Sequence, residues 1–462
     1  MAGKQAEQAN CCSGPLPAVP MAGYLRGNPL LSRVPRKPWD TLGELVFMVF
    51  SGAFAWLAYF CIAGRENGSF ERYSFFGYGG RKKAEDLTKM GRLYLHIGTP
   101  KTGTSMIQFF MAKNQGILLR KGYTYPDFEF TFEGIGQNRN AHFLTHEYYD
   151  DDKNRLYDEE KKLQEQGFSR LLDELRQNEN VVMSDEHIWT GYRVMENFWE
   201  NLVKRVTEAG HELKVIVYLR RQDAYIQSYW AQLVKETSKE SFSAYIKKKH
   251  YYKSRMDYNT ELDVIANIVG RENLIVRIYE KGQYYGGNGS LVEDFLHVIG
   301  LEMTEEYKGS ERIVNGSISG DCLEVKRILN RMPEFRARKN FLIPVMQKVT
   351  SREGKSSDYF RAACFAEGQR KEFLEQFREG NEAVARKYLN KDSGVLFEEE
   401  APENETVKAY TKEELVLACG ELLLEMEELV QKITEREMRI KQSRSYRLLK
   451  KGKSVVKKII RR

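Results

Sequence analysis

Cysteine is scarce in this chain, with six residues among 462. Three of them lie in the first 90 residues, and the others, Cys322, Cys364 and Cys419, are widely spaced. This pattern provides neither a disulfide framework nor the paired spacing of a zinc site, and it favours a reducing compartment. Internal repeats are absent as well.

Acidic residues are missing from the end of the chain. Residues 439–462 contain 11 Lys or Arg and no Asp or Glu, and subtracting these 11 charges from the net charge of +7 leaves −4 for the rest. The body is therefore mildly acidic. In the basic tail, 443–462, Tyr446, Leu449, Val456 and Ile460 share one helical face, which suits an anionic membrane surface. A solvated end is the alternative, and we expect no nucleic acid as partner.

Residues 1–89 form an extension that differs from the rest of the chain. The segment 45–63 runs for 19 residues without a charge, long enough to cross a bilayer as a helix. It starts too late and is too long for a signal peptide. Met90 also reads as a natural start, so 1–89 is alternatively an upstream addition. We expect a cytoplasmic protein, with membrane association at its ends; a single-pass, Golgi-type protein anchored by 45–63 is the alternative.

Short apolar strands alternate with helices from residue 93 onward. Strands are expected at 93–97, 181–183, 213–219 and 274–279, and helices at 104–119, 168–177, 198–209, 224–235 and 291–299. Strands that alternate with helices predict an α/β domain, in which a parallel sheet is covered on both faces. From 320 to 389 the pattern is mostly helical. The domain is expected to span 90–397.

A long helix is expected over 411–442, after an acidic linker at 398–410. Leu415, Cys419, Leu422, Met426, Leu429, Ile433 and Ile440 recur at spacings of four, three and seven. This seam fits a coiled coil, through which the chain would form a homo-oligomer at 415–440. A helix packed on the body of the domain is an equal alternative.

A glycine-rich loop follows the first expected strand and opens the next helix. It reads Gly98-Thr99-Pro100-Lys101-Thr102-Gly103-Thr104-Ser105. Free backbone N–H groups at a helix start, together with the helix dipole, bind anions. The lysine that ordinary nucleotide-hydrolysing loops carry after the second glycine is missing, because Thr104 stands there. The lysine lies inside the loop instead, at Lys101.

This loop resembles that of the sulfotransferase superfamily, whose signature PKxGT matches residues 100–104. The resemblance covers about 93–397 and implies a P-loop three-layer fold and the co-substrate 3'-phosphoadenosine-5'-phosphosulfate (PAPS). It implies that Lys101 stabilises the leaving 5'-phosphate. It also implies that Arg220, at a strand end, and Ser228 bind the 3'-phosphate; Arg221 competes for this role, and Gln222 stands where the family often has Pro. The expected co-substrate-binding residues are Pro100, Lys101, Thr102, Gly103, Thr104, Ser105, Arg220 and Ser228.

The reaction implied is transfer of a sulfuryl group to a hydroxyl or amine, in which a side chain takes the acceptor's proton. Glu186 is the preferred base, followed by His187 and then His142, because the first two follow the strand at 181–183. No metal is expected. The membrane-like features near both ends of the chain, the apolar segment 45–63 and the basic tail, suggest a glycan or lipid acceptor. A P-loop kinase or ATPase using ATP and Mg²⁺, and a non-catalytic membrane-associated scaffold, are the rival functions.

Overall fold

The computed structural model describes residues 91–247, 253–287, 289–309, 318, 320–352, 364–401 and 409–442. Three regions of the sequence analysis lie outside these residues: the extension with its apolar segment 45–63, most of the acidic linker (402–408) and the basic tail 443–462. The chain divides into two compact units, Met1–Lys89 with Tyr149–Leu156, and Met90–Tyr148 with Tyr157–Arg462. In the first unit the structure describes only 149–156, a turn in which the Asn154 N–H donates to Asp150 (2.8 Å). The described strands and helices all belong to the second unit.

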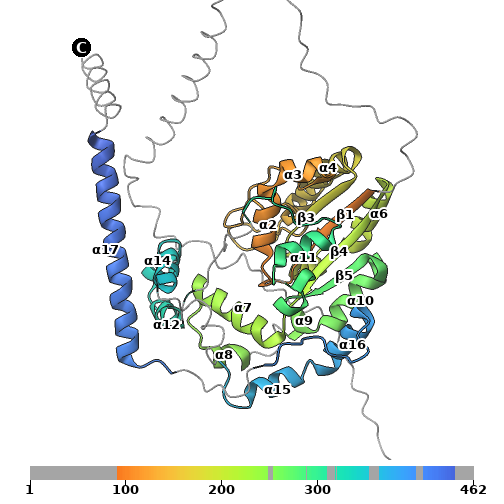
Figure 1. Cartoon of the computed structure of the whole chain (residues 1–462). Coiled ribbons are helices and arrows are strands. Elements are labelled where there is room, and N and C mark those ends of the chain that lie inside the picture. The colour runs from red at the N-terminus through yellow and green to blue at the C-terminus, as the bar shows by residue number, and fades with distance from the viewer. Residues whose placement is uncertain are drawn as a thin grey trace, which may run out of the picture. The chain divides into compact units, whose positions relative to one another are not determined.

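A five-stranded parallel sheet forms the centre of this unit (Figure 1). The strand order is β2-β3-β1-β4-β5, with β1 in the middle, where Leu95 is level with Met183 on one side and Val215 on the other. The α/β class and the parallel sheet are thus confirmed. The strands are β1 (Gly91–His96), β2 (Tyr123–Thr124), β3 (Asn180–Ser184), β4 (His211–Leu219) and β5 (Leu274–Ile278).

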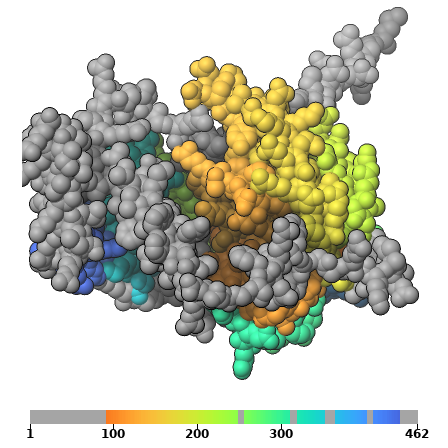
Figure 2. Space-filling view, turned by 90° about the horizontal axis from the view of Figure 1, so that it is seen from above, coloured from red at the N-terminus to blue at the C-terminus, as the bar shows by residue number. Residues whose placement is uncertain are grey.

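Helices cover both faces of the sheet, which makes the three layers that the sequence predicts. Side chains alternate along β4, so Val215 and Val217 face one hydrophobic core while Ile216 and Tyr218 face the other. The first core is closed by α4 (Tyr157–Gln177), α6 (Phe198–Glu208) and α10 (Tyr258–Val269). The second core is closed by α2 (Thr104–Lys113), α3 (Gln115–Arg120) and α11 (Leu291–Val298). Figure 2 shows α11, in green, beside the orange residues that follow β1.

Some helix boundaries differ from those predicted. The single helix expected at 104–119 is broken at Asn114, whose side-chain amide donates to the Phe110 carbonyl (2.9 Å) and whose side-chain oxygen accepts from the Lys308 N–H (2.8 Å). Helix α4 begins at Tyr157, well before the expected residue 168. The sequence reading omitted α10, which is capped by Asp257 accepting from the Thr260 N–H (3.4 Å).

The C-terminal part is helical, as expected, and has a hydrophobic core of its own. It packs around α7 (Gln222–Glu236), the helix that follows β4, and so remains attached to the edge of the sheet where the strands end. Its main members are α8 (Phe242–Lys247), α12 (Gly320–Leu329), α14 (Lys339–Arg352) and α15 (Gln369–Glu375).

The remaining described helices of the chain are α5 (Ile188–Gly191), α9 (Lys253–Met256), α13 (Pro333–Arg336) and α16 (Arg378–Leu389). The structure also has 3₁₀ turns at His142–Leu144, Tyr192–Val194, Arg271–Asn273, Lys281–Gln283 and Tyr285–Gly287.

The long helix α17 (Lys412–Gln442) packs on α12 and α14. Ala418 and Leu422 are buried in the helical core, and Lys348 of α14 pairs with the fully buried carboxylate of Glu425. From Val430 to Ile440 its residues are exposed. The first part of α17 therefore follows the body-packed alternative of the sequence analysis. Across the described ranges, none of the helices combines the length and apolar character that crossing a membrane requires.

Candidate active site

The glycine-rich loop lies at the point where the strand order changes direction. In the sheet, β1 lies between β3 and β4, so later strands are added on both of its sides. Ligands of parallel α/β sheets bind at the carboxyl ends of the strands at such a point. The loop remains attached to β4: the Tyr218 N–H donates to the Gly98 carbonyl (2.7 Å), and the Thr99 N–H donates to the Tyr218 carbonyl (3.0 Å). The sheet therefore fixes where the loop begins.

The loop conformation depends on its two glycines. Gly98 (φ +100°) and Gly103 (φ +76°) both adopt a left-handed backbone, which other residues rarely do. At Gly103 a Cβ atom would lie 2.4 Å from the Leu291 side chain, so there is no room for one. The Thr102 hydroxyl donates to the Thr99 carbonyl (2.5 Å) and closes the turn. Helix α2 then begins at Thr104, with its first N–H groups directed toward the loop.

Lys101 lies inside this turn, as the sequence predicts, with a left-handed backbone of its own (φ +71°). Its ammonium group donates to Gln232 of α7 (3.4 Å). Burial, together with the nearby charges of Lys235 and Arg220, lowers the Lys101 pKa to about 8. Burial also lowers the Lys235 pKa. Desolvated cations gathered at one place favour an anionic ligand, since buried charge is costly unless compensated.

Arg220 is connected directly to the loop. Its guanidinium donates to the Lys101 carbonyl (2.7 Å) and lies over the Tyr279 ring, 5.5 Å from the centroid. Its own carbonyl accepts from the Tyr258 hydroxyl (2.6 Å). Ser228 is buried on α7, one helical turn before Gln232, so these two side chains share a face of the helix. The structure thus brings Lys101, Arg220 and the Ser228 face of α7 together.

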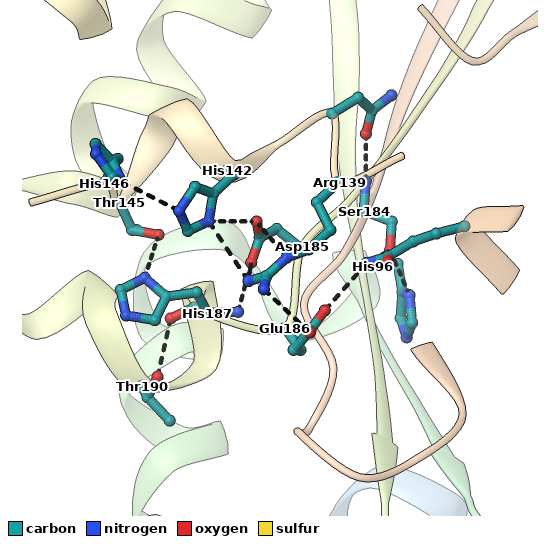
Figure 3. A network of polar contacts seen from close by, with 12 residues as sticks. His96, Arg139, His142, Thr145, His146, Ser184, Asp185, Glu186, His187 and Thr190 are labelled. Carbon is teal, nitrogen blue, oxygen red and sulfur yellow. Dashed lines mark hydrogen bonds and ion pairs between the residues drawn. The ribbon is translucent and has the colours of Figure 1, made fainter. Parts of the chain in front are cut away.

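Glu186 also lies against the loop. A Cβ atom on Gly98 would come within 3.1 Å of the Glu186 Cβ, and the charge of Glu186 acts on Lys101. Its carboxylate accepts from Gln108 of α2 (3.0 Å). It also pairs with Arg139 (3.4 Å), as Figure 3 shows. The carboxylate is therefore held by two neighbours close to the lysine.

The other two candidate bases are in different environments (Figure 3). Burial lowers the pKa of His187 to about 4, and its Nδ1 is 3.2 Å from the Thr145 hydroxyl. His142 is buried, with its Nδ1 2.8 Å from the Asp185 carboxylate and its Nε2 3.1 Å from His146. Burial alone would raise the Asp185 pKa, but Arg139 and His142 outweigh it and hold that pKa well below its usual range. His142 thus belongs to a buried ion network.

Four residues of the site were missed by the sequence analysis: Gln108, Arg139, Gln232 and Lys235. Gln232 and Lys235 follow Ser228 by four and seven residues, so helical periodicity could have placed them on the same face. Arg139 lies three residues before the candidate base His142, but its partners Asp185 and Glu186 come directly after β3. Only the fold brings these groups together.

The residues present fit a nucleotide with a 5'-phosphosulfate. The Thr104 hydroxyl at the start of α2 is buried and, within the described ranges, has no hydrogen-bond partner, so it is available to a phosphate oxygen. The loop and Lys101 would hold the 5' end, and Arg220 with Ser228 the 3'-phosphate. Over the same part of the chain, no group of His, Cys, Asp and Glu side chains is arranged to hold a metal ion.

Comparisons with known proteins add limited information. No family model matches the chain. A protein of Archaeoglobus fulgidus described as uncharacterized is 34% identical over 194 residues, which are 40% of this chain and 49% of that protein. The chain thus matches about half the length of this curated relative.

Among solved structures, a sulfotransferase from Alicyclobacillus acidocaldarius matches with a TM-score of 0.32 and 18% identity, over 54% of this chain and 95% of that one. A score this low does not by itself define a fold, so the fold class rests on the chain's own five parallel strands and its loop. These features are consistent with the P-loop sulfotransferase fold expected from residues 98–105.

Proposed function

We propose that this chain is a sulfotransferase, which moves a sulfuryl group from PAPS to a hydroxyl or amine of an acceptor. One observation carries the proposal: the guanidinium of Arg220 donates to the carbonyl of Lys101 inside the loop. Two cations that recognise opposite ends of a PAPS-type nucleotide are thereby joined at one site. A lysine at this place suits a nucleotide whose reacting group is on a single 5'-phosphate better than a triphosphate, for which the usual lysine follows the second glycine.

In the proposed reaction, the acceptor oxygen or nitrogen forms a bond to sulfur while the bond between sulfur and the 5'-phosphate oxygen breaks. The electron pair of the broken bond leaves with 3'-phosphoadenosine-5'-phosphate (PAP). Lys101 and the loop N–H groups stabilise the charge that develops on the leaving phosphate. Glu186 accepts the acceptor's proton, and its contacts with Gln108 and Arg139 keep its carboxylate near the reacting atoms.

The acceptor belongs to the proposal as a class only: a glycan or a lipid. The support for it comes from the sequence, with the apolar segment 45–63 and the basic tail 443–462 at the two ends of the chain. Sulfation of small phenols but not of saccharides or glycolipids would contradict this class while leaving the nucleotide assignment intact.

The experiment that tests the function is a binding measurement by calorimetry with PAP and with ADP, each with Mg²⁺ and with EDTA. We expect PAP to bind tightly and independently of metal, Lys101→Ala to abolish binding, and Arg220→Ala to weaken it. Lys239→Ala, at an exposed position beyond α7, is the matched control and should bind PAP normally. Preference for ADP with Mg²⁺ would favour the kinase alternative and overturn the proposal.

A further inference from the structure

Helix α7 presents one face to the site, on which Ser228, Gln232 and Lys235 follow one another. Under the proposed function, Ser228 contacts the 3'-phosphate. The Gln232 side chain accepts from the ammonium group of Lys101 (3.4 Å), which would hold the 5' end. A helix rises by about 1.5 Å per residue, so Lys235 lies roughly 4.5 Å beyond Gln232 along the helix axis. This order places Lys235 past the part of the site that the nucleotide would occupy.

Lys235 is a cation without a counter-ion. Within the described ranges, no side chain or backbone group pairs with its ammonium group. Its side chain is half-buried, and burial lowers its pKa. The neighbouring acid, Glu236, is engaged elsewhere: one carboxylate oxygen accepts from Gln232 (3.1 Å), and the other pairs with Lys339 of α14. A desolvated ammonium group without an anion costs free energy, so this one favours an anionic ligand.

The charge of Lys235 also reaches the glycine-rich loop. It lowers the Lys101 pKa more than the charge of Arg220 does, although Arg220 donates to the Lys101 backbone. Among the acids whose charges oppose this effect, Glu186 already pairs with Arg139 (3.4 Å). Positive charge is therefore in excess between the loop and the C-terminal half of α7.

The nucleotide does not account for this excess charge. Its 3'-phosphate would be held by Arg220 and Ser228. Its 5'-phosphosulfate would be held by Lys101 and the loop N–H groups, with the buried Thr104 hydroxyl, which has no hydrogen-bond partner in the described part of the chain. Each anionic group of PAPS thus already has a cation and further donors. An additional anion at Lys235 would have to come from the second substrate.

We propose that the acceptor carries an anionic group close to the hydroxyl or amine that receives the sulfuryl group, and that Lys235 binds this anion. The inference rests on the function proposed above and narrows its acceptor class. A neutral acceptor would leave the Lys235 ammonium group without a counter-ion in the complex, whereas an anion would form a charge-assisted hydrogen bond with it. Lys235 would thus select the acceptor, while Lys101 serves the reaction.

The test is calorimetry on the full chain saturated with PAP, with two matched pairs of acceptors. The first pair is an unsulfated chondroitin tetrasaccharide and the same tetrasaccharide with its carboxylates reduced to alcohols. The second pair is glucuronosyl diacylglycerol and glucosyl diacylglycerol in phosphatidylcholine vesicles, so that a saccharide source of the anion is distinguished from a lipid source. We expect the anionic member of one pair to bind about 10–100-fold more tightly than its neutral partner.

Lys235→Gln should remove this preference and leave PAP affinity unchanged, because it removes the charge but retains a polar side chain of similar reach. Lys235→Arg stays charged and should keep the preference. Lys239→Gln is the matched control, since it makes the same change at an exposed position beyond α7, and it should bind all four acceptors as the original chain does.

Failure of both anionic acceptors to bind more tightly than their neutral partners, in a chain that binds PAP, would overturn this inference and leave the proposed function standing. A Lys235→Gln chain that keeps the preference would also overturn it. So would a Lys235→Gln chain that loses PAP affinity, since the ammonium group would then serve the nucleotide. Failure of the original chain to bind PAP would overturn the proposed function, and this inference with it.

Discussion

At the residue scale, the position of one ammonium group separates the proposed function from its rivals. Lys101 is held in the loop by a left-handed backbone, donates to Gln232, and has its carbonyl fixed by Arg220. Burial, together with the charges of Lys235 and Arg220, lowers its pKa to about 8, so its charged form is disfavoured without a compensating anion. The charge of this group should therefore control nucleotide affinity.

We predict that PAP affinity depends on pH in a way set by Lys101. Because burial lowers the pKa of the free site to about 8, the ammonium form predominates below that pH and is lost above it. A bound phosphate favours the charged form and raises the pKa, so affinity should be nearly constant from pH 6.5 to 7.5 and fall as pH rises from 8 to 10. Calorimetric titration with PAP measures this. Lys101→Arg stays charged over this range, so its PAP affinity should not decline from pH 8 to 10. An equal decline of PAP affinity in Lys101→Arg would assign the pH dependence to another group.

A second prediction at this scale concerns Glu186. Glu186→Gln keeps the hydrogen-bonding shape but cannot accept a proton, so the rate of PAP formation from PAPS with a saccharide acceptor should fall by about 10²–10⁴-fold, with PAP affinity nearly unchanged. Stopped assays of PAP release measure it. His187→Gln is the comparison, because the Nδ1 atom of His187 lies 3.2 Å from the Thr145 hydroxyl, whereas Glu186 lies against the glycine-rich loop. A larger loss in His187→Gln than in Glu186→Gln would reverse the assignment.

At the element scale, the proposed function makes the loop and the first turn of α2 a single anion-binding unit. Ala at Gly103 would need a left-handed backbone and would also overlap Leu291, whereas Ala at Gly122, between α3 and β2, would need the left-handed backbone but would meet nothing within 4 Å. Gly122→Ala should cost about 1–2 kcal/mol in unfolding free energy from its backbone alone, and Gly103→Ala should cost more because the overlap with Leu291 adds to the same backbone cost. Only Gly103→Ala should lose PAP binding. Urea unfolding and calorimetry check this pair, and normal PAP binding by Gly103→Ala would contradict the role of the loop.

The sequence predicted those parts of the site that depend on local pattern. Lys101 and Glu186 follow buried strands, and Arg220 follows a β-branched one, so the parallel sheet alone brings these residues to one edge. Contacts between distant segments were not predictable. Gln232 reaches Lys101 across 131 positions of sequence, and Arg139 reaches Asp185 across 46. The alternation of strands and helices likewise gave the fold class, whereas the break at Asn114 depends on a hydrogen bond to the Lys308 backbone from outside the local segment.

At the scale of the whole molecule, a helical subdomain with its own core is attached to the sheet through α7. The alternation of buried and exposed leucines on α17 allows this attachment to be measured. Leu422→Ala should lower the unfolding free energy by about 2–4 kcal/mol, because Leu422 is buried against the helical core. Leu417→Ala, at a position 68% exposed, should change it by less than about 0.5 kcal/mol. Thermal unfolding at low protein concentration measures both, and equal effects would contradict the docking of α17 on the body.

The bond from the Arg220 guanidinium to the Lys101 carbonyl has a consequence for discrimination among nucleotides. A ligand that lacks the 3'-phosphate leaves the guanidinium without its anion, and the disturbance reaches the backbone that carries the reactive lysine. Under the proposed function we therefore expect the two halves of the nucleotide to be sensed cooperatively: adenosine 5'-phosphosulfate should suffer in turnover as well as in affinity, even though its sulfuryl group is the same.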